Sequence, residues 1–412
     1  MTWKPRLIDP GELDAVVDLT ATAFGVGPVA PPDYRARATT GVEVDRTFVV
    51  DDGTDVVGTG AAYSFELALP GGTVPVAGVS EVGVRPSHRR RGILTALMDA
   101  LFDQAIDRGE PLAALTASEG GIYRRFGYGV AARYQSVTVQ RARSAELVTV
   151  PAAGQVRLVD EAEAEAALPA VWERHWRRFP GEVRRTPTWW RVLALDPESQ
   201  REGASARFVA VHDDGHGAPD GFATYRIKHD WRAEGSRHQL IVEDVAAADD
   251  GVEAALVRYL LDVDLISVVH WPAAPLDLSL RWRLADSRAL QVTAEADHLW
   301  LRPVDLARCL ASRRYGAEGG LVVEVVDAAR PALGGRFRLE AGAGGSEARC
   351  DRTDAEPEVA LAMADIGALL LGGVSWATLR RAGLVDERVV GAVARADALF
   401  RTERAPFCGS DF

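Results

Sequence analysis

The chain of 412 residues contains only three cysteines, Cys309, Cys350 and Cys408, and they lie far apart from one another. They provide neither the pairs of a disulfide framework nor the close spacing of a zinc site. The histidines between residues 212 and 238 do not have metal-ligand spacing either. We therefore expect no metal in this protein.

Long apolar runs are also missing from the sequence. Residues 1–6 lack the apolar stretch of a signal peptide. The apolar run 256–271 is interrupted by Arg258, Asp262 and Asp264, so it cannot span a bilayer. We expect a cytoplasmic protein that does not insert into membranes.

Basic residues are outnumbered by acidic ones, and the formal net charge is −12. This balance argues against nucleic acid as a general partner, because phosphate binding needs a basic surface. An acidic surface would instead attract a cationic substrate. The length and the hydrophobic fraction of 47% indicate a globular protein of two or three domains.

Strands and helices alternate in the pattern between residues 44 and 134. The expected elements are a strand at Thr47–Val50, a strand at Val56–Phe65, a third strand at Thr73–Val84, a helix at 93–106, a buried strand at Leu112–Ala117, and a turn with a short helix at 118–125. A weaker copy of this order follows, with a hairpin at 208–227, a strand at Leu240–Val245 and a helix at Val252–Val263. We interpret the two copies as an internal duplication.

A third segment begins after about Asp286. It contains a strand-like run at Leu321–Asp327, a hairpin near residues 336–339 and a helix-rich stretch from Asp365. The glycine-rich loop 341–346 lacks the lysine and the strand-then-helix context of a phosphate-binding loop, so we expect a surface turn.

The segment Val82-Gly83-Val84-Arg85-Pro86-Ser87-His88-Arg89-Arg90-Arg91-Gly92-Ile93-Leu94 carries the strongest functional signal. A strand ends, a basic loop follows, and an amphipathic helix begins at once. The N-terminus of a helix presents unpaired N–H groups, and a glycine such as Gly92 lets a phosphate approach the backbone. Arginines add charge-assisted bonds to a diphosphate. The second copy has Asp249-Asp250-Gly251 at this point, so we expect only one working site.

This segment resembles the coenzyme A-binding motif of GNAT-type acetyltransferases, Q/R-x-x-G-x-G/A. Arg89, Gly92 and Leu94 occupy its fixed positions, and Leu94 departs from the usual small residue. The run from Thr116 to Gly129 narrows the resemblance to the Eis (enhanced intracellular survival) family. The resemblance implies an α+β chain with a catalytic GNAT-like domain at 1–145, a degenerate GNAT-like domain at 146–286, and a sterol-carrier-like domain at 287–412.

The same resemblance implies acetyl-coenzyme A as co-substrate and names the residues around it. The strand residues would pair with the pantetheine arm, the loop and the first turn of the helix would hold the pyrophosphate, and Ser118 and Glu119 would line the opposite wall. The set is Val82, Gly83, Val84, Arg89, Arg90, Arg91, Gly92, Ile93, Leu94, Thr95, Ser118 and Glu119.

Two further residues are implied for the chemistry. Tyr123 occupies the place of the family's general acid, since a phenol with a pKa near ~10 stays protonated at neutral pH. Tyr128 and Tyr134 are alternatives for this role. The carboxylate of Phe412, the last residue, is implied as the general base, with the C-terminal tail returning to the catalytic domain.

The family forms hexamers and acetylates aminoglycosides, often at several amines, or protein lysines. A cationic amine acceptor and a homo-oligomer are therefore the expected partners. The loop at Phe24–Arg37 carries no motif that would decide between acceptors. Two other classes stay open, namely a protein that binds apolar ligands through the third domain, and a GNAT-fold regulator without catalysis.

Overall fold

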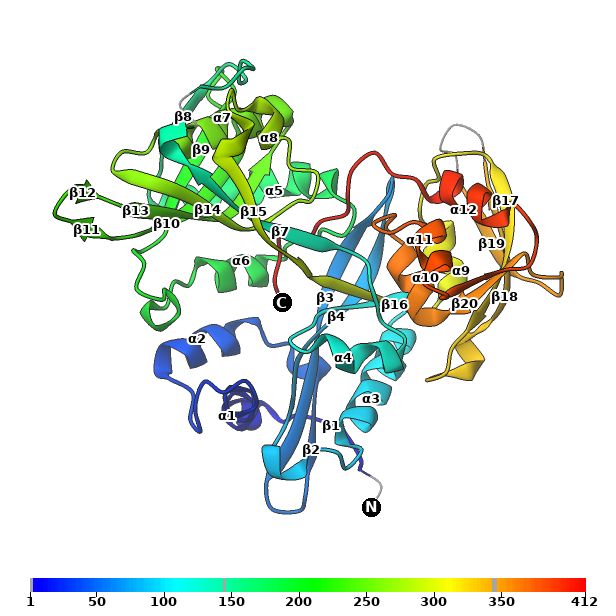
Figure 1. Cartoon of the computed structure of the whole chain (residues 1–412). Helices are drawn as coiled ribbons and strands as arrows, with labels where there is room; N and C mark the ends of the chain where they lie inside the picture. The colour runs from blue at the N-terminus through cyan, green and yellow to red at the C-terminus, as the bar shows by residue number, and fades with distance from the viewer. Residues whose placement is uncertain (1–2, 144–145, 343–346) are drawn as a thin grey trace. The chain divides into compact units, whose positions relative to one another are not determined.

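The computed structural model describes residues 3–143, 146–342 and 347–412 (Figure 1). The chain divides into two compact units, each assembled from separate stretches of sequence. The first comprises Met1–Ala132, Phe179–Val183 and Asp297–Phe412, and the second comprises Arg133–Arg178 and Arg184–Ala296. The predicted boundary at residue 145 and part of the predicted loop 341–346 lie outside the described residues. The predicted limits of the three domains stay predictions.

The first unit contains a seven-stranded sheet in the order β1-β2-β3-β4-β5-β16-β6. Its strands are β1 (Arg6–Leu7), β2 (Thr47–Asp51), β3 (Val56–Leu69), β4 (Gly72–Val84), β5 (Leu112–Thr116), β16 (Leu299–Pro303) and β6 (Gly129–Val130). The helices that accompany them are α1 (Leu13–Ala23), α2 (Pro32–Gly41), α3 (Ile93–Asp107) and α4 (Gly120–Tyr123). All the elements predicted for this region are present, and β3 extends four residues beyond its predicted end at Phe65.

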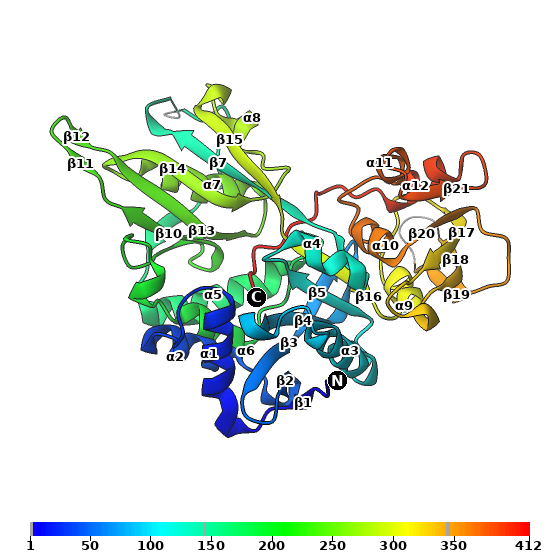
Figure 2. The same ribbon diagram turned by 60° about the horizontal axis from the view of Figure 1, so that its bottom comes forward.

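Helices cover both faces of this sheet. On one face, Gly58 and Gly60 of β3 lie directly against Ile93 and Leu101 of α3, so closely that a Cβ on Gly58 would lie 2.4 Å from Ile93. On the other face, α1 packs on β3 and β4 (Figure 2). The regular apolar spacing along α3 gives it one buried side, which explains why the sequence predicted this helix well.

The second unit repeats the arrangement with the order β15-β7-β14-β13-β10-β9-β8. These strands are β15 (Leu290–Asp297), β7 (Arg133–Gln140), β14 (Ile266–Ala274), β13 (His238–Ala247), β10 (Pro219–Lys228), β9 (Phe208–Asp213) and β8 (Gln155–Leu158). Its helices are α5 (Glu161–His175), α6 (Pro187–Ala194), α7 (Asp250–Asp262) and α8 (Leu280–Arg283), and β11 (Trp231–Arg232) and β12 (Gly235–Ser236) form a short hairpin. The predicted repeat of hairpin, strand and helix is confirmed by β9, β10, β13 and α7.

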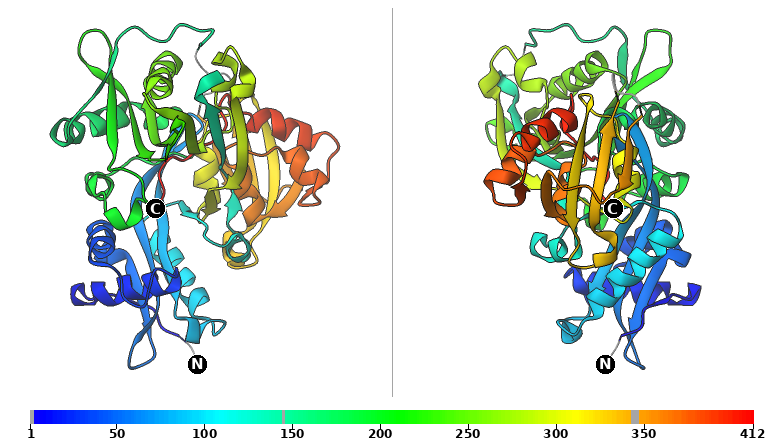
Figure 3. Two further views of the ribbon diagram at one scale, coloured as in Figure 1. Left: turned by 60° about the vertical axis from the view of Figure 1, so that its left-hand side comes forward. Right: turned by 90° about the vertical axis from the view of Figure 1, so that its right-hand side faces the viewer.

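The rest of the first unit is a five-stranded sheet in the order β19-β18-β17-β20-β21 with helices packed on it (Figure 3). Its elements are β17 (Gly319–Val326), β18 (Gly335–Ala341), β19 (Arg349–Arg352), β20 (Val359–Ala362), β21 (Val385–Glu387), α9 (Leu306–Ala311), α10 (Met363–Leu369), α11 (Trp376–Arg381) and α12 (Ala392–Phe400). The predicted strand near 321–327, the hairpin and the helix-rich stretch are all present.

A buried ion pair joins this five-stranded sheet to the first sheet. The Arg302 side chain on β16 is fully buried, and its Nη2 lies 2.7 Å from Asp327 Oδ2 just beyond β17. Its Nε also donates a hydrogen bond to the Phe126 carbonyl at 2.8 Å. Because a buried charge without a partner is very costly, this pairing fixes β16 against both regions.

None of the described helices combines the length and the apolar character needed to cross a bilayer.

Candidate active site

The site is built around the place where β4 and β5 separate. The two strands are paired in parallel only between Val76–Gly78 and Leu112–Ala114. Beyond that point β4 continues to Val84 paired with β3 alone, while β5 continues to Thr116 paired with β16. The predicted residues Val82, Gly83 and Val84 lie in the separated part of β4. One edge of this stretch has no strand partner among the described residues, so its backbone groups are available to an extended ligand.

The loop after β4 leads directly into the N-terminus of α3. Gly92 is the N-cap residue and has a left-handed backbone with φ 87°, which favours glycine. No side chain caps this helix, so the first amides of α3, from Ile93 onward, have no side-chain acceptor. The Ile93 side chain is buried in the core, and only its backbone can contribute to binding.

The arginines of this loop differ in their surroundings. Arg89 and Arg90 are exposed, and neither has an ion-pair partner within the described parts of the chain. Arg91 is fixed differently, because its carbonyl accepts a hydrogen bond of 2.8 Å from Trp3 Nε1 and its guanidinium lies 5.7 Å from the Trp3 ring centre. Two free guanidinium groups beside an uncapped helix N-terminus form a site suited to a diphosphate.

The corresponding helix of the second copy is closed to an anion. The N-cap of α7 is Asp249, whose Oδ1 accepts hydrogen bonds from the amides of Gly251 at 2.7 Å and Val252 at 2.9 Å. The carboxylate therefore occupies the position that a phosphate would need, and its charge repels one. The second copy, with Asp249 in place of the arginine-rich loop, therefore lacks the open anion site found at α3.

Ser118 and Glu119 lie exposed between β5 and α4, and Tyr123 ends α4. The Tyr123 side chain is buried, with its ring centre 6.0 Å from that of Tyr128. Burial, and to a smaller extent the charge of Glu119, raises the pKa of Tyr123 above its usual value. The Tyr128 hydroxyl is fully buried and has no hydrogen-bond partner in the described chain, so it is poorly placed to meet a substrate.

The C-terminal tail lies along the first sheet. Its last residue, Phe412, is part-buried, and the Thr116 hydroxyl donates a hydrogen bond of 3.0 Å to its main-chain oxygen. The Phe412 ring lies 5.1 Å from that of Phe65 on β3, and it approaches Gly78 so closely that a Cβ there would lie 3.2 Å from the ring. Gly78 is the last residue of β4 that pairs with β5. The terminal carboxylate therefore lies where the two strands separate.

A buried glutamate fixes the tail in this position. Glu182 is 3% exposed and belongs to a short segment that pairs with the free edge of β3 through Ala68. Its Oε2 accepts a hydrogen bond of 2.6 Å from the amide of Gly409, and its Oε1 lies 3.7 Å from Cys408 Sγ. Two residues before Gly409, the amide of Phe407 donates to the Pro180 carbonyl at 2.9 Å.

Sequence analysis missed several residues that shape this site, above all Thr116, Phe65 and Glu182. Thr116 begins the motif that includes Ser118 and Glu119, so its position at the end of a buried strand was a usable signal. Glu182 gave no such signal, because its tail partner lies 227 residues away in the sequence.

The comparisons with known proteins agree with this geometry. Residues 4–131 and 181–303 each match a model described as an acetyltransferase (GNAT) domain, and residues 306–409 match a sterol carrier protein domain. The predicted α+β fold with two GNAT domains and a sterol-carrier-like domain is thus confirmed. The chain is an acetyl-coenzyme A-dependent N-acetyltransferase of the GNAT class.

Whole-chain relatives narrow the assignment. An N-acetyltransferase from Streptomyces avermitilis, named as uncharacterized, is 38% identical over 100% of both chains. The N-acetyltransferase Eis of Mycobacterium bovis is 34% identical over 93% of each chain. The structure of Eis1 from Mycobacterium abscessus has a TM-score of 0.86 at 33% identity, with 100% of both chains covered. The chain belongs to the Eis family.

The two helix N-termini predict one coenzyme A site per chain, at α3 only. Reversing charge with Arg89→Glu and Arg90→Glu should abolish binding measured by calorimetry, because both free guanidinium groups become repulsive carboxylates. Asp249→Asn is the matched control in the second copy, and it should leave the stoichiometry at one. Two sites in the wild type, or unchanged affinity in the double variant, would contradict this prediction.

The Glu182 contacts predict that this residue holds the tail in place. Glu182→Ala leaves the amide of Gly409 without its acceptor, and a lost charged hydrogen bond of about 1.5–3 kcal/mol should open the tail about tenfold or more. Carboxypeptidase should then release Phe412 faster than from the wild type. Glu12→Ala, which removes a surface partner of Arg6, should not change the rate. Equal release from all three proteins would show that Glu182 does not anchor the tail.

Proposed function

We propose that this enzyme transfers acetyl from acetyl-coenzyme A to primary amines of a cationic acceptor, with aminoglycosides as the leading class. The observation that carries the proposal is the position of the Phe412 carboxylate beside Thr116, where β4 separates from β5. A chain terminus is normally frayed and exposed. Here the last residues are ordered by Glu182, and the final ring packs on Phe65, which is expected if the terminus has a role in the reaction.

The co-substrate supplies an electrophilic thioester carbonyl and a thiolate leaving group. Backbone groups at the separated edge of β4 would hold its pantetheine arm, and the first turn of α3 with Arg89 and Arg90 would hold the pyrophosphate. In this arrangement the thioester would lie near the end of β5, beside Thr116 and the terminal Phe412. Positioning of this kind accounts for a large part of the rate of a two-substrate reaction.

Acetyl transfer requires two proton movements. The amine nitrogen attacks the carbonyl carbon, the C–S bond breaks, and the nitrogen loses a proton. In our proposal the Phe412 carboxylate accepts that proton, and the Tyr123 hydroxyl donates one to the departing sulfur. Burial keeps the Tyr123 hydroxyl protonated at neutral pH, because it raises the pKa above its usual 10.0. Direct transfer then needs no covalent enzyme intermediate.

The proposal predicts that Tyr123→Phe lowers turnover of kanamycin by about 10²–10⁴-fold while coenzyme A affinity is unchanged. On the alkaline side, the wild-type rate should decline as the pH rises through the raised pKa of Tyr123, since the acid form is the donor. A spectrophotometric assay of thiol release measures both effects. Tyr128→Phe serves as the control, because its hydroxyl makes no hydrogen bond within the described residues. A loss confined to Tyr128→Phe would transfer the role to that residue.

The position of the terminal carboxylate gives the most direct test. Deleting Phe412 moves the terminus back by one residue, about 3.5 Å, which is enough to break a proton-transfer contact. We expect turnover to fall about 100-fold or more, as for the loss of a general base, with coenzyme A binding intact. Phe412→Tyr retains the carboxylate and the aromatic packing and should stay within a few-fold of wild type. Full activity of the deletion variant would refute the terminal base.

A further inference from the structure

Glu81 is an unusual residue in the separated part of β4. The pairing of β3 with β4 shifts register here, since Thr59 pairs with Gly83 and Ala61 with Ser80. Glu81 lies in the resulting bulge and has φ 52°, a left-handed conformation that is rare for a residue with a side chain. Such strain persists at positions where the surrounding structure requires it, and these are often functional sites.

The Glu81 carboxylate lies on the face of the sheet that α1 covers, beside Thr20 of that helix. Its neighbours include the hydroxyl groups of Thr20, Tyr34 and Tyr63. Burial raises the pKa of Glu81, which shows that its charge is poorly solvated. No lysine, arginine or histidine forms an ion pair with Glu81 within the described residues. A carboxylate in such a place favours a cation that is not part of the chain.

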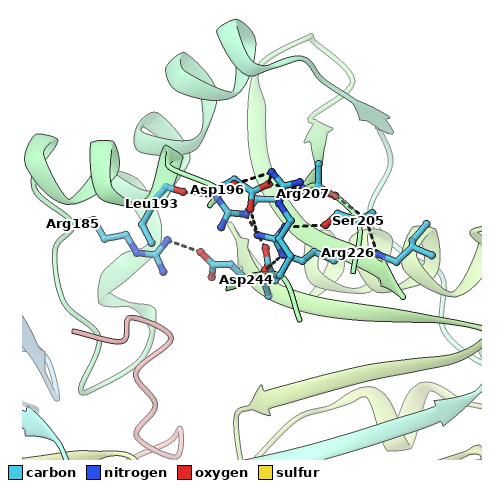
Figure 4. Close-up of polar contacts among 11 residues, drawn as sticks. Arg185, Leu193, Asp196, Ser205, Arg207, Arg226 and Asp244 are labelled. Carbon is cyan, nitrogen blue, oxygen red and sulfur yellow. Dashed lines mark hydrogen bonds and ion pairs between the residues drawn. The ribbon is translucent and has the colours of Figure 1, made fainter. Parts of the chain in front are cut away.

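The second copy shows what a carboxylate at this position binds. β13 has a bulge at the corresponding place, between the pairs Thr224 with Asp244 and Tyr225 with Val242, and Glu243 is the extra residue. Glu243 is held by Arg226 Nε at 2.5 Å and Arg207 Nε at 2.8 Å. Figure 4 shows both arginines in the network that also includes Asp196. In the second copy the bulge glutamate is thus neutralised by protein cations.

The first copy has no arginine in the position from which Arg226 neutralises Glu243. On β10, Tyr225 packs on the side of α7 and the next residue, Arg226, projects from the opposite side. Counted from the bulge, Ala62 on β3 has the position of Arg226, because Ala61 pairs with Ser80 as Tyr225 pairs with Val242. The first copy therefore has an alanine where the second copy has its arginine. The charge of Arg37 acts on Tyr34 and Tyr63, but Arg37 forms no ion pair with Glu81, so the Glu81 carboxylate has no protein counter-ion within the described residues.

Glu81 is three residues from Gly78, against which the Phe412 ring packs. At about 3.3 Å per strand residue, the two positions are about 10 Å apart along β4. We propose that the Glu81 carboxylate binds an ammonium group of the acceptor, separate from the amine that reaches Phe412, and so selects diamines and polyamines over monoamines. This inference rests on the proposed function, because it concerns the acceptor of the same reaction.

The test compares 1,6-diaminohexane with hexylamine, which differ only in the second ammonium group, in the wild type and in Glu81→Gln. We expect the wild type to prefer the diamine in kcat/KM. Glu81→Gln should reduce this preference about tenfold, equivalent to about 1.4 kcal/mol, with the hexylamine value unchanged. Gln has the shape of Glu without its charge, and Glu12→Gln is the control for loss of a carboxylate elsewhere on the first unit.

The preference for the diamine decides the outcome. The same ratio in the wild type and in Glu81→Gln would overturn the inference, and so would an equal loss for both amines, which would place Glu81 on the reacting amine. If Glu81→Gln does not fold, Glu81→Asp is the second variant, because it retains the charge on a shorter side chain. Its ratio of kcat/KM for the diamine to kcat/KM for hexylamine should be intermediate. A ratio equal to that of the wild type would again overturn the inference.

Calorimetric binding of 1,6-diaminohexane separates the two proposals, because it does not depend on turnover. Binding that Glu81→Gln weakens about tenfold, without acetylation by the wild type, would support the Glu81 site and refute the proposed function. Acetylation of the diamine by the wild type, with binding that Glu81→Gln leaves unchanged, would support the proposed function and refute the Glu81 site.

Discussion

The separation of β4 from β5 is the constraint on which the arrangement of the site depends. Three paired residues on each strand hold the sheet together, and beyond Gly78 the strands follow different partners. This separation exposes one edge of β4 and directs the end of β4 toward α3. It also leaves Thr116, at the end of β5, beside the opening between the two strands. A diphosphate at α3, an extended arm along the free edge of β4 and an amine beside Thr116 could then be bound one after another along this opening. A continuous sheet would pair the same backbone groups with each other and leave none for a ligand.

The two GNAT copies share this architecture and differ in the groups that would meet a ligand. Both have the bulged third strand and the following helix, but their charged groups differ. In the second copy Asp249 caps α7 and two arginines neutralise Glu243, so both charged positions are satisfied within the protein. In the first copy α3 has no side-chain cap, and Glu81 has no basic partner among the described residues. Function on a shared fold follows from such unsatisfied groups.

The sequence predicted the parts of the molecule that depend on neighbouring residues. The periodicity of α3 and the glycine at its start are local patterns, so the cofactor loop could be located without a structure. The return of β16 to the first sheet could not, because strand pairing over nearly 200 residues has no local signature. The Thr116 contact with the terminus spans 296 residues and was accessible only through family resemblance. The bulge at Glu81 depends on register, which alternation alone does not define.

The proposed base at the chain terminus would link catalysis to the folding of a distant region. Side-chain substitution cannot remove a main-chain carboxylate, so its action depends on where the tail is held. Arg313, buried and with its pKa lowered to about 10 by burial, donates hydrogen bonds to the carbonyls of Leu370 at 2.8 Å and Phe400 at 3.1 Å. Arg313 thus fixes the end of α12 at Phe400, and Glu182 fixes the tail nine residues further on, at Gly409. Both ends of the intervening chain are therefore anchored by buried polar side chains. Loosening either anchor would displace the terminal carboxylate without changing any group proposed to touch the substrate.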